Sequence, residues 1–282
     1  MDCVRKKMIG KVIVYVVIIL VTLINLFPYI WMAVNSFRDS AEPLTSSLIP
    51  HSWSLKSYID IFTAGSQQTA NTLVAMKNSF MVSALSTLLT SFLAILSGYG
   101  FSIFRFRGRS FLMAFLINMR TFPGILLAIS LFVMAGKVGL FDTFLVLILA
   151  NTMMNLPFAI WNNISIIDSV PMEIEESAMV DGLKRVPAIM KIVFPIAAPG
   201  IVGTIAYTFI LTWNEYLFAT NFISSASKEM ITTRIAASVG QFNTDFSLLL
   251  STSMLASLPL IILFLVIQKY IVAGLAMGSV KG

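Results

Sequence analysis

Long apolar runs separated by short polar segments dominate the pattern of this chain. A helix needs roughly 20 mostly apolar residues to cross the hydrocarbon core of a bilayer. Six runs approach or exceed that length: 12–34, 78–104, 111–135, 144–165, 197–220 and 247–270. Each should be helical, because lipid offers no hydrogen-bond partner to an exposed peptide group. The pattern therefore predicts an all-α integral membrane protein with six transmembrane helices.

Three prolines interrupt these runs, at positions 28, 123 and 157. Proline lacks the N–H of a helical hydrogen bond and its ring clashes with the preceding turn, so we expect kinks there. The carbonyl groups that a kink frees must then be satisfied by neighbouring helices or by a water-filled cavity.

The basic residues predict how the helices are oriented. With the N-terminus in the cytoplasm, the inner segments hold about twice as many Lys and Arg residues as the outer ones, as the positive-inside rule requires. Both termini, and a polar segment at 166–196, are then cytoplasmic. Arg5, Lys6 and Lys7 give the N-terminus the look of a signal peptide. The apolar run that follows exceeds the roughly 7–15 residues of a signal core, so we interpret it as the first span.

Composition agrees with a membrane chain and limits its chemistry. Of 282 residues, 57% are hydrophobic and 11% charged, and the mean hydropathy is +0.89. A soluble domain of this size could not bury so much apolar surface. With one cysteine, Cys3, and one histidine, His51, we expect neither an internal disulfide nor a transition-metal site. The net charge of +6 lies beside the spans, so it indicates topology and not a nucleic-acid partner. Without a long linker or a clear repeat, residues 1–282 form a single predicted transmembrane domain.

The polar segment 166–196 lies between the fourth and fifth spans and predicts a short capped helix. Pro171 suits the first position of a helix. Glu173, Glu175 and Glu176 follow where the helix dipole favours anions. Gly182 suits the residue after the last turn, where a left-handed conformation needs no side chain. We expect a helix over 171–181, a second short helix from Pro187, and a redirection of the chain at Pro195 and Pro199. The local pattern alone fits an ordinary amphipathic connector equally well.

This segment resembles the "EAA loop" of bacterial ABC-importer permeases. The matching residues are Pro171, Glu175-Glu176, Ala178, Asp181-Gly182 and Phe194-Pro195. Other segments with the family's pattern lie along the whole chain: Trp31 with Asn35-Ser36-Phe37, Tyr99-Gly100-Phe101 before Arg105 to Arg109, Gly139 to Thr143, Thr212 to Leu217, and the tail from Gln268 to Gly282. Together they resemble the smaller permease subunit of a maltose-type carbohydrate ABC importer. Ser177 departs from the family's usual alanine, a change between small residues.

The resemblance implies a multi-pass protein of the bacterial cytoplasmic membrane that works in a complex. The expected partners are a second, different permease, two ATP-binding subunits and an extracytoplasmic sugar-binding protein, with the lipid bilayer around them. ATP and Mg²⁺ would be used by the ATPase subunits, and we expect no cofactor on this chain. Gly136-Lys137 is followed by Val138, so it does not form a nucleotide-binding loop. The predicted ATPase-coupling residues are Glu175, Glu176, Ser177, Ala178, Asp181 and Gly182. A second candidate contact is the tail, namely Gly278, Ser279, Val280, Lys281 and Gly282, although a frayed terminus is the alternative.

Polar side chains inside the predicted spans are candidates for the translocation path. They are Arg120, Asn151, Asn155, Trp213, Asn214 and Glu215. A charged residue inside the membrane usually faces a bundle interior or water. Planar polar groups and aromatic faces are also what neutral sugars require. The alternative is that these side chains tie helices or subunits together, and that alternative is the more common one.

Two other classes of function fit less well. A stand-alone secondary transporter needs paired ionisable groups at one depth of the membrane. Arg120 has no acid at its depth, because Glu215 lies about 13 Å away along the membrane normal at 1.5 Å per residue. An intramembrane enzyme needs a catalytic constellation, and the spans contain none. A permease for a solute other than a sugar remains the main alternative.

Overall fold

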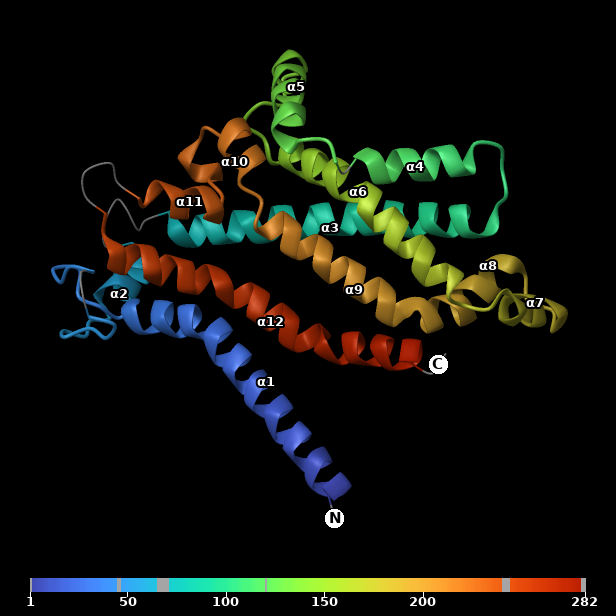
Figure 1. The fold of residues 1–282 in the computed structure, drawn as a ribbon. Helices are drawn as coiled ribbons and strands as arrows, with labels where there is room; N and C mark the ends of the chain where they lie inside the picture. Colours follow the sequence, from blue (N-terminus) through green and yellow to red (C-terminus); the bar gives the residue numbers. More distant parts are fainter. Residues whose placement is uncertain (1, 45–46, 65–70, 120, 240–243, 280–282) are drawn as a thin grey trace. The chain divides into compact units, whose positions relative to one another are not determined.

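The computed structural model describes all residues except 1, 45–46, 65–70, 120, 240–243 and 280–282. The side chains of residues 2–9 and 270–279 are also outside the description. The described chain is helical, and its one β-bridge joins Arg38 to Trp53. The α-helices are α1 Asp2–Asn35, α2 Lys56–Thr63, α3 Thr72–Ile103, α4 Arg109–Met119, α5 Gly124–Lys137, α6 Phe144–Asp168, α7 Met172–Val180, α8 Arg185–Ala188, α9 Phe194–Trp213, α10 Leu217–Phe222, α11 Ile231–Ala237 and α12 Phe246–Ser279 (Figure 1). A π-helical turn, Ile189–Val193, joins α8 to α9, and a 3₁₀ turn occupies Ala226–Lys228.

Five helical segments in the described chain are long and apolar enough to cross a membrane. They are Gly10–Asn35, Thr72–Ile103, Phe144–Asp168, Arg185–Trp213 and Phe246–Lys269. The pair α4 and α5 would make a sixth, but the two helices are bent by 95° at a break that includes residue 120. The sixth predicted span, 111–135, is thus present as two helices, which count as one broken span if the pair is taken together. Pro123 stands directly before α5, at the break where a kink was expected.

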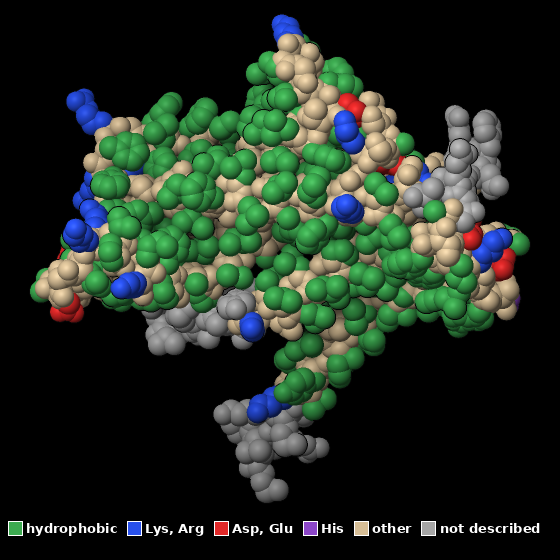
Figure 2. All heavy atoms as spheres, turned by 180° about the vertical axis from the view of Figure 1, so that it is seen from behind, with side chains coloured by type: hydrophobic (Ala, Val, Ile, Leu, Met, Phe, Trp, Pro, Cys, Tyr) green, Lys and Arg blue, Asp and Glu red, His purple; other side chains and the backbone are tan. Residues whose placement is uncertain are grey.

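The helices form two compact units, each with its own internal packing. The first contains Met1–Thr72 and Ile235–Ser257, and the second contains Leu73–Arg234 and Leu258–Gly282. In the second unit α6 packs on both α4 and α9 (Figure 1). On the face shown in Figure 2, hydrophobic side chains cover most of the surface and charged side chains are sparse. Such a surface suits lipid and would be a liability in water.

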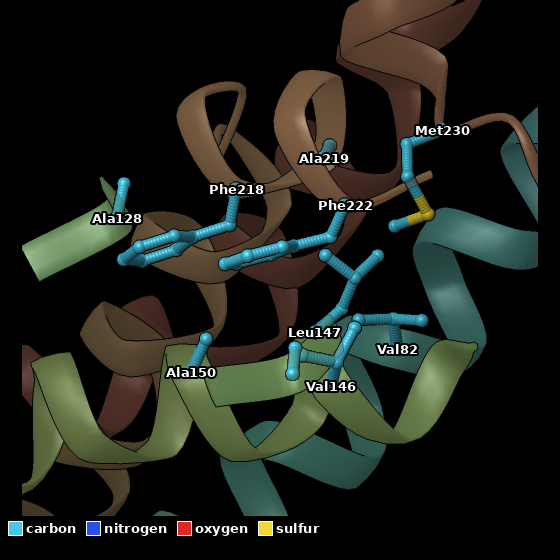
Figure 3. Close-up of a cluster of buried hydrophobic side chains, with 10 residues drawn as sticks. Val82, Ala128, Val146, Leu147, Ala150, Phe218, Ala219, Phe222 and Met230 are labelled. Atoms are coloured by element: carbon cyan, nitrogen blue, oxygen red, sulfur yellow. The ribbon is translucent and has the colours of Figure 1, made fainter. Parts of the chain in front are cut away.

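A cluster of buried apolar side chains holds one end of the second unit together. The rings of Phe218 and Phe222 on α10 stack with centroids 5.8 Å apart. Ala128 on α5, Val146 and Leu147 on α6, and Val82 on α3 belong to the same cluster (Figure 3). The cluster fixes α10 against the transmembrane helices. Its stacked rings stabilise this contact beyond what the burial of their apolar area provides.

Asp142, in the turn between α5 and α6, ties that turn to the chain that follows α10. Its backbone N–H donates to the carbonyl of Phe222 at 2.9 Å. Its carboxylate accepts from the hydroxyl of Ser225 and from the backbone N–H groups of Ser225 and Ser224, and it also pairs with Lys228. These bonds, led by the Ser225 hydroxyl, lower the pKa of Asp142 well below its usual range. The turn is therefore held by a carboxylate that stays ionised.

In the first unit, the fully buried side chain of Arg38 fixes the segment that follows α1. Its guanidinium donates to Oδ1 of Asn35 at 2.7 and 3.0 Å, to the carbonyl of Ser47 at 3.0 Å, and to the carboxylate of Glu42. Glu42 in turn accepts from the backbone N–H groups of His51 and Ser52 at 3.0 and 2.9 Å. These bonds, led by that of His51, lower the pKa of Glu42 to about 2. The segment between residues 38 and 52 is thus closed by charge-assisted hydrogen bonds.

Candidate functional site

The helix predicted over 171–181 is present as α7, Met172–Val180, one residue shorter at each end. Pro171 stands just before the first turn. Gly182 has φ = +94°, the left-handed conformation that a side chain disfavours. The N–H of Gly182 donates to Met179 at 3.1 Å and that of Leu183 donates to Ala178 at 3.1 Å, so the last turn keeps its hydrogen bonds. The proline and the glycine therefore delimit this helix as the sequence predicted.

Glu175 joins α7 to two other helices through its carboxylate. Its Oε1 accepts from the hydroxyl of Tyr99 on α3 at 3.0 Å and from Nε of Arg185 on α8 at 3.1 Å. The guanidinium of Arg185 also lies 5.5 Å above the ring of Phe104, a favourable cation–π distance. The side chain of Glu175 is 5% exposed, so it faces its own chain and not a partner. We refer to Tyr99, Glu175 and Arg185 as the Glu175 clamp.

The six predicted coupling residues divide between the two faces of this helical loop. Glu175 and Ala178 are buried. Glu176, Ser177, Asp181 and Gly182 are exposed. The same segment also exposes five apolar side chains, and they are Met172, Met179, Val180, Val186 and Met190. Val180 is the most extreme, at 87% exposure. Exposed apolar side chains interspersed with acidic ones along a short helical segment are typical of a surface that binds another protein.

A cavity of 340 Å³ lies beside the first turn of α7. Ser102 and Ile103 from the end of α3, Asp168 from the end of α6, and Glu173 from α7 line it. The hydroxyl of Ser102 donates to the carboxylate of Asp168 and so joins α3 to α6 at the cavity wall. The first turn of α7 is therefore not closely packed on the side of this cavity.

Two glycines bring the helices near α7 into close contact with α6. A Cβ built on Gly98 of α3 would lie 2.8 Å from Cβ of Asn163. A Cβ built on Gly200 of α9 would lie 2.8 to 3.0 Å from three side-chain carbons of Ile166. Both distances are too short for real carbon atoms, so only glycine allows these approaches. The ends of α3, α6 and α9 thus form a tightly packed block beneath the loop.

The chain passes from the loop into the next span without the predicted redirection. Helices α8 and α9 are continuous through the π turn, and the span runs over Arg185–Trp213 instead of 197–220. The prediction for Pro195 and Pro199 was wrong. The turn shifts one bond, so that the N–H of Phe194 donates to the carbonyl of Ile189, five residues back. Pro195 follows directly, in the first turn of α9, where its missing N–H is tolerated.

Asn151 and Asn155 are buried on α6, and their side chains form hydrogen bonds within the protein. Each donates to the backbone carbonyl four residues earlier at 2.9 Å. Asn155 also reaches the hydroxyl of Thr212 on α9 at 3.4 Å. Only the contact of Asn155 with Thr212 joins two helices, so a place for either asparagine on the translocation path stays a prediction.

The end of α9 places the other predicted path residues differently. Trp213 is 3% exposed and stacks on Phe209 at 6.0 Å, whereas Asn214 is exposed. Glu215 was expected within the span, but it lies beyond the end of α9, where its carboxylate accepts from the N–H groups of Phe218 and Ala219. Glu215 therefore caps α10. The first N–H groups of a helix have no partner within the helix, and this carboxylate accepts hydrogen bonds from two of them. Arg120 and Val280–Gly282 lie outside the described residues, as do the side chains of Gly278 and Ser279.

Sequence reasoning missed the roles of Tyr99 and Arg185. Tyr99 is a polar side chain within an apolar run, near the end of a span. That was the available signal, but the run carries no information about which loop would meet it. Arg185 lies just past the end of α7 in the sequence, and its side chain folds back onto Glu175 in the middle of that helix.

Apolar helices of spanning length, with a polar helical loop between two of them, define a polytopic membrane protein with a candidate docking surface. The chain belongs to the family described as "Binding-protein-dependent transport system inner membrane component", whose model matches residues 90–277. It is therefore an inner-membrane component of a transport system and not an enzyme.

Comparisons over the full length agree with that membership. The chain is 33% identical over 280 residues to the inner membrane ABC transporter permease protein YcjP of Escherichia coli (strain K12), with 99% of each chain covered. It is 30% identical over 279 residues to the trehalose/maltose transport system permease protein MalG of Thermococcus litoralis, again with 99% of each covered. Its fold is similar to a chain of a bacterial ABC transporter involved in the import of alginate, with a TM-score of 0.77, 18% identity, and coverage of 95% and 98%.

Proposed function

We propose that this chain is the permease subunit of an ATP-driven importer for a sugar or oligosaccharide. The membership in a binding-protein-dependent transport family supports the importer, and the name of the relative MalG supports the sugar. A second permease would complete the translocation path, two ATPase subunits would supply ATP hydrolysis with Mg²⁺, and a binding protein would deliver the solute. A solute other than a sugar is the second candidate.

The exposed face of α7 is the observation that carries the coupling mechanism. It combines acidic Glu176 and Asp181 with Val180 and Met179, and it is held from behind by the Glu175 clamp. With both termini in the cytoplasm, this face meets the ATPase. Closure of the ATPase dimer on binding ATP would carry α7 with it, and the permease pair would open outward. Hydrolysis would restore the inward-facing state.

Docking of α7 is tested by a bulky substitution at Gly182. A β-branched residue at φ = +94° costs about 1–2 kcal/mol or more in a left-handed conformation. It should shift the exposed corner and uncouple ATP hydrolysis from uptake, while the chain still inserts into the membrane. Full uptake by Gly182→Val would contradict the proposal. Gly136→Val, at a glycine whose Cβ would meet no neighbour, is the matched control.

Purification in mild detergent tests the complex itself. An affinity tag on this chain should recover an ATPase, a second permease and a sugar-binding protein. The ligand of that binding protein can then be identified by a thermal-shift screen of mono- and oligosaccharides against amino acids and peptides. A binding protein that is stabilised by peptides alone would favour the second candidate.

The predicted path and the tail are tested separately by uptake. Arg120→Ala should change the affinity or the rate of uptake if Arg120 lines the path, and unchanged values would remove it. Asn155→Ala should lower stability before it alters affinity, since its side chain bonds within the bundle. Deletion of residues 278–282 should lower ATPase activity if the tail contacts the ATPase, and normal activity and uptake would show a passive terminus.

A further inference from the structure

Helix α2, in the segment that follows α1, carries an exposed apolar stripe. Leu55, Ile59 and Phe62 are 58%, 56% and 60% exposed. Their spacing of four and three residues places them on one side of the helix. Leu48 and Ile49, before α2, are exposed to a similar degree. A short helix with this much unburied apolar surface needs a partner that removes it from water.

The other two sides of α2 are already accounted for. Ser57 and Ile61 are buried, and the hydroxyl of Ser57 lies 2.7 Å from that of Ser247 on α12. Lys56 and Thr63 are exposed and polar, on the side that is left for water. The helix thus has one side for its own unit, one for water and one that is apolar and exposed. Three such sides are what a helix at a membrane surface requires.

The backbone fixes the depth of this element relative to the end of a span. Arg38, three residues after the last residue of α1, forms an antiparallel bridge with Trp53. The N–H of Ser54 donates to the carbonyl of Phe37 at 2.7 Å, which extends the pairing. Residues 10–35 of α1 are apolar and long enough to cross a membrane, and residues 10–30 are all exposed. A span of this kind ends at the boundary with water, here close to Asn35. Trp53 must then lie within a few residues of that boundary.

Trp53 also has the chemistry that this depth favours. It is 61% exposed, with no ring contact among the described residues. Tryptophan is enriched at the level of the lipid headgroups, where its ring is partly in hydrocarbon and its N–H reaches water. The buried guanidinium of Arg38 bonds to Asn35 and to the carbonyl of Ser47, and so fixes the backbone with which Trp53 pairs.

We propose that residues 48–62 form an interfacial anchor, with Trp53, Leu55, Ile59 and Phe62 seated in the lipid headgroup region at the end of α1. The bridge of Arg38 to Trp53 holds this exposed apolar surface close to the end of an apolar helix of spanning length, which favours lipid over a protein partner. Lys56 then lies on the water side, where its ammonium can meet lipid phosphates. The anchor would fix the height of α1 in the bilayer during transport.

Spin labelling tests this depth with matched controls on one helix. Cys3→Ser removes the single native cysteine. Nitroxides are then placed singly at 55, 59 and 62, and at 56 and 63 as controls, in the complete transporter in liposomes. Collision with oxygen, which partitions into lipid, is compared with collision with a water-soluble nickel chelate. The three stripe positions should show an oxygen-to-nickel ratio several-fold above that of the two controls, at headgroup depth.

Two results would overturn the anchor. Equal ratios at stripe and control positions would put the stripe in water. Protection of the stripe from both reagents would put it against protein, either the second permease or, if it appears only on adding the binding protein, that protein. A second measurement does not depend on labelling. The fluorescence of Trp53 is obtained as the difference between the unmodified chain and Trp53→Phe. Lipids brominated near the headgroup should quench this difference, and a difference that they do not quench would equally reject the proposal.

Discussion

The Glu175 clamp distinguishes Glu175 from Glu176, two adjacent acids whose sequence context is nearly the same. Glu175→Gln keeps the shape of the side chain and an oxygen that can accept from Tyr99, but it removes the charge that Arg185 meets. A hydrogen bond to a charged group contributes about 1.5–3 kcal/mol. Arg185 is 41% exposed, and water takes over part of its interaction, so we expect about 2 kcal/mol, near the lower end of that range.

That free energy should appear as local opening of α7. Because 1.4 kcal/mol is a factor of ten, about 2 kcal/mol raises the opening constant roughly thirty-fold. Amide hydrogen exchange over residues 172–183, in the assembled complex without nucleotide, measures this opening directly. Uptake should fall relative to ATP hydrolysis in the same variant, because a loosened helix carries less of the ATPase's motion.

Glu176→Gln is the matched control, because Glu176 is exposed and forms no ion pair with the residues that the structure describes. Its exchange should equal that of the unmodified chain, even if docking to the ATPase is weakened. The exchanged pair Glu175→Arg with Arg185→Glu should recover part of the protection. Exchange in Glu175→Gln within twofold of the unmodified chain, or equal acceleration in both single variants, would refute the role of the clamp.

Two further predictions concern packing and pH. Gly98→Ala forces a Cβ to within 2.8 Å of Asn163 and should cost about 1–3 kcal/mol; its melting temperature in detergent should fall, whereas Gly100→Ala, which meets no neighbour, should not lower it. Because bonds led by the N–H of His51 depress the pKa of Glu42 from 4.5 to about 2, its stabilisation is complete above pH 4.5 and is lost as the pH falls toward 2. Hydrogen exchange over residues 38–54, corrected for its intrinsic pH dependence, should accelerate across that window, and Glu42→Gln should remove the effect.

The spans and the loop helix could be predicted from sequence because their signals are local. Apolar length marks a span whatever it packs against, and Pro171 and Gly182 mark helix ends through their own backbone preferences. The continuation through Pro195 could not be predicted in the same way. Proline usually interrupts a helix, and only the π turn before it makes the position acceptable.

The Glu175 clamp lay beyond sequence reasoning for a different reason. Tyr99 and Glu175 are 76 residues apart, and no pattern in either segment specifies the other. Their meeting depends on the close approach of α3 to α6 at Gly98. Likewise, Glu215 was placed inside a span because the apolar run continues past it. The helix ends at Trp213, and the carboxylate of Glu215, two residues further on, accepts from amides in the first turn of a new helix, α10.

The unbroken helix from Arg185 to Trp213 also sets a stand-off distance. Its 29 residues span about 44 Å at 1.5 Å per residue, whereas the hydrocarbon core is about 30 Å thick. Up to about 14 Å of this helix therefore projects past the lipid tails, and a tilt of the helix from the membrane normal shortens this projection. An ATPase subunit that binds the Arg185 end of this helix would be held away from the lipid headgroups. A probe of small-molecule size could enter that gap at the membrane surface without crossing the bilayer.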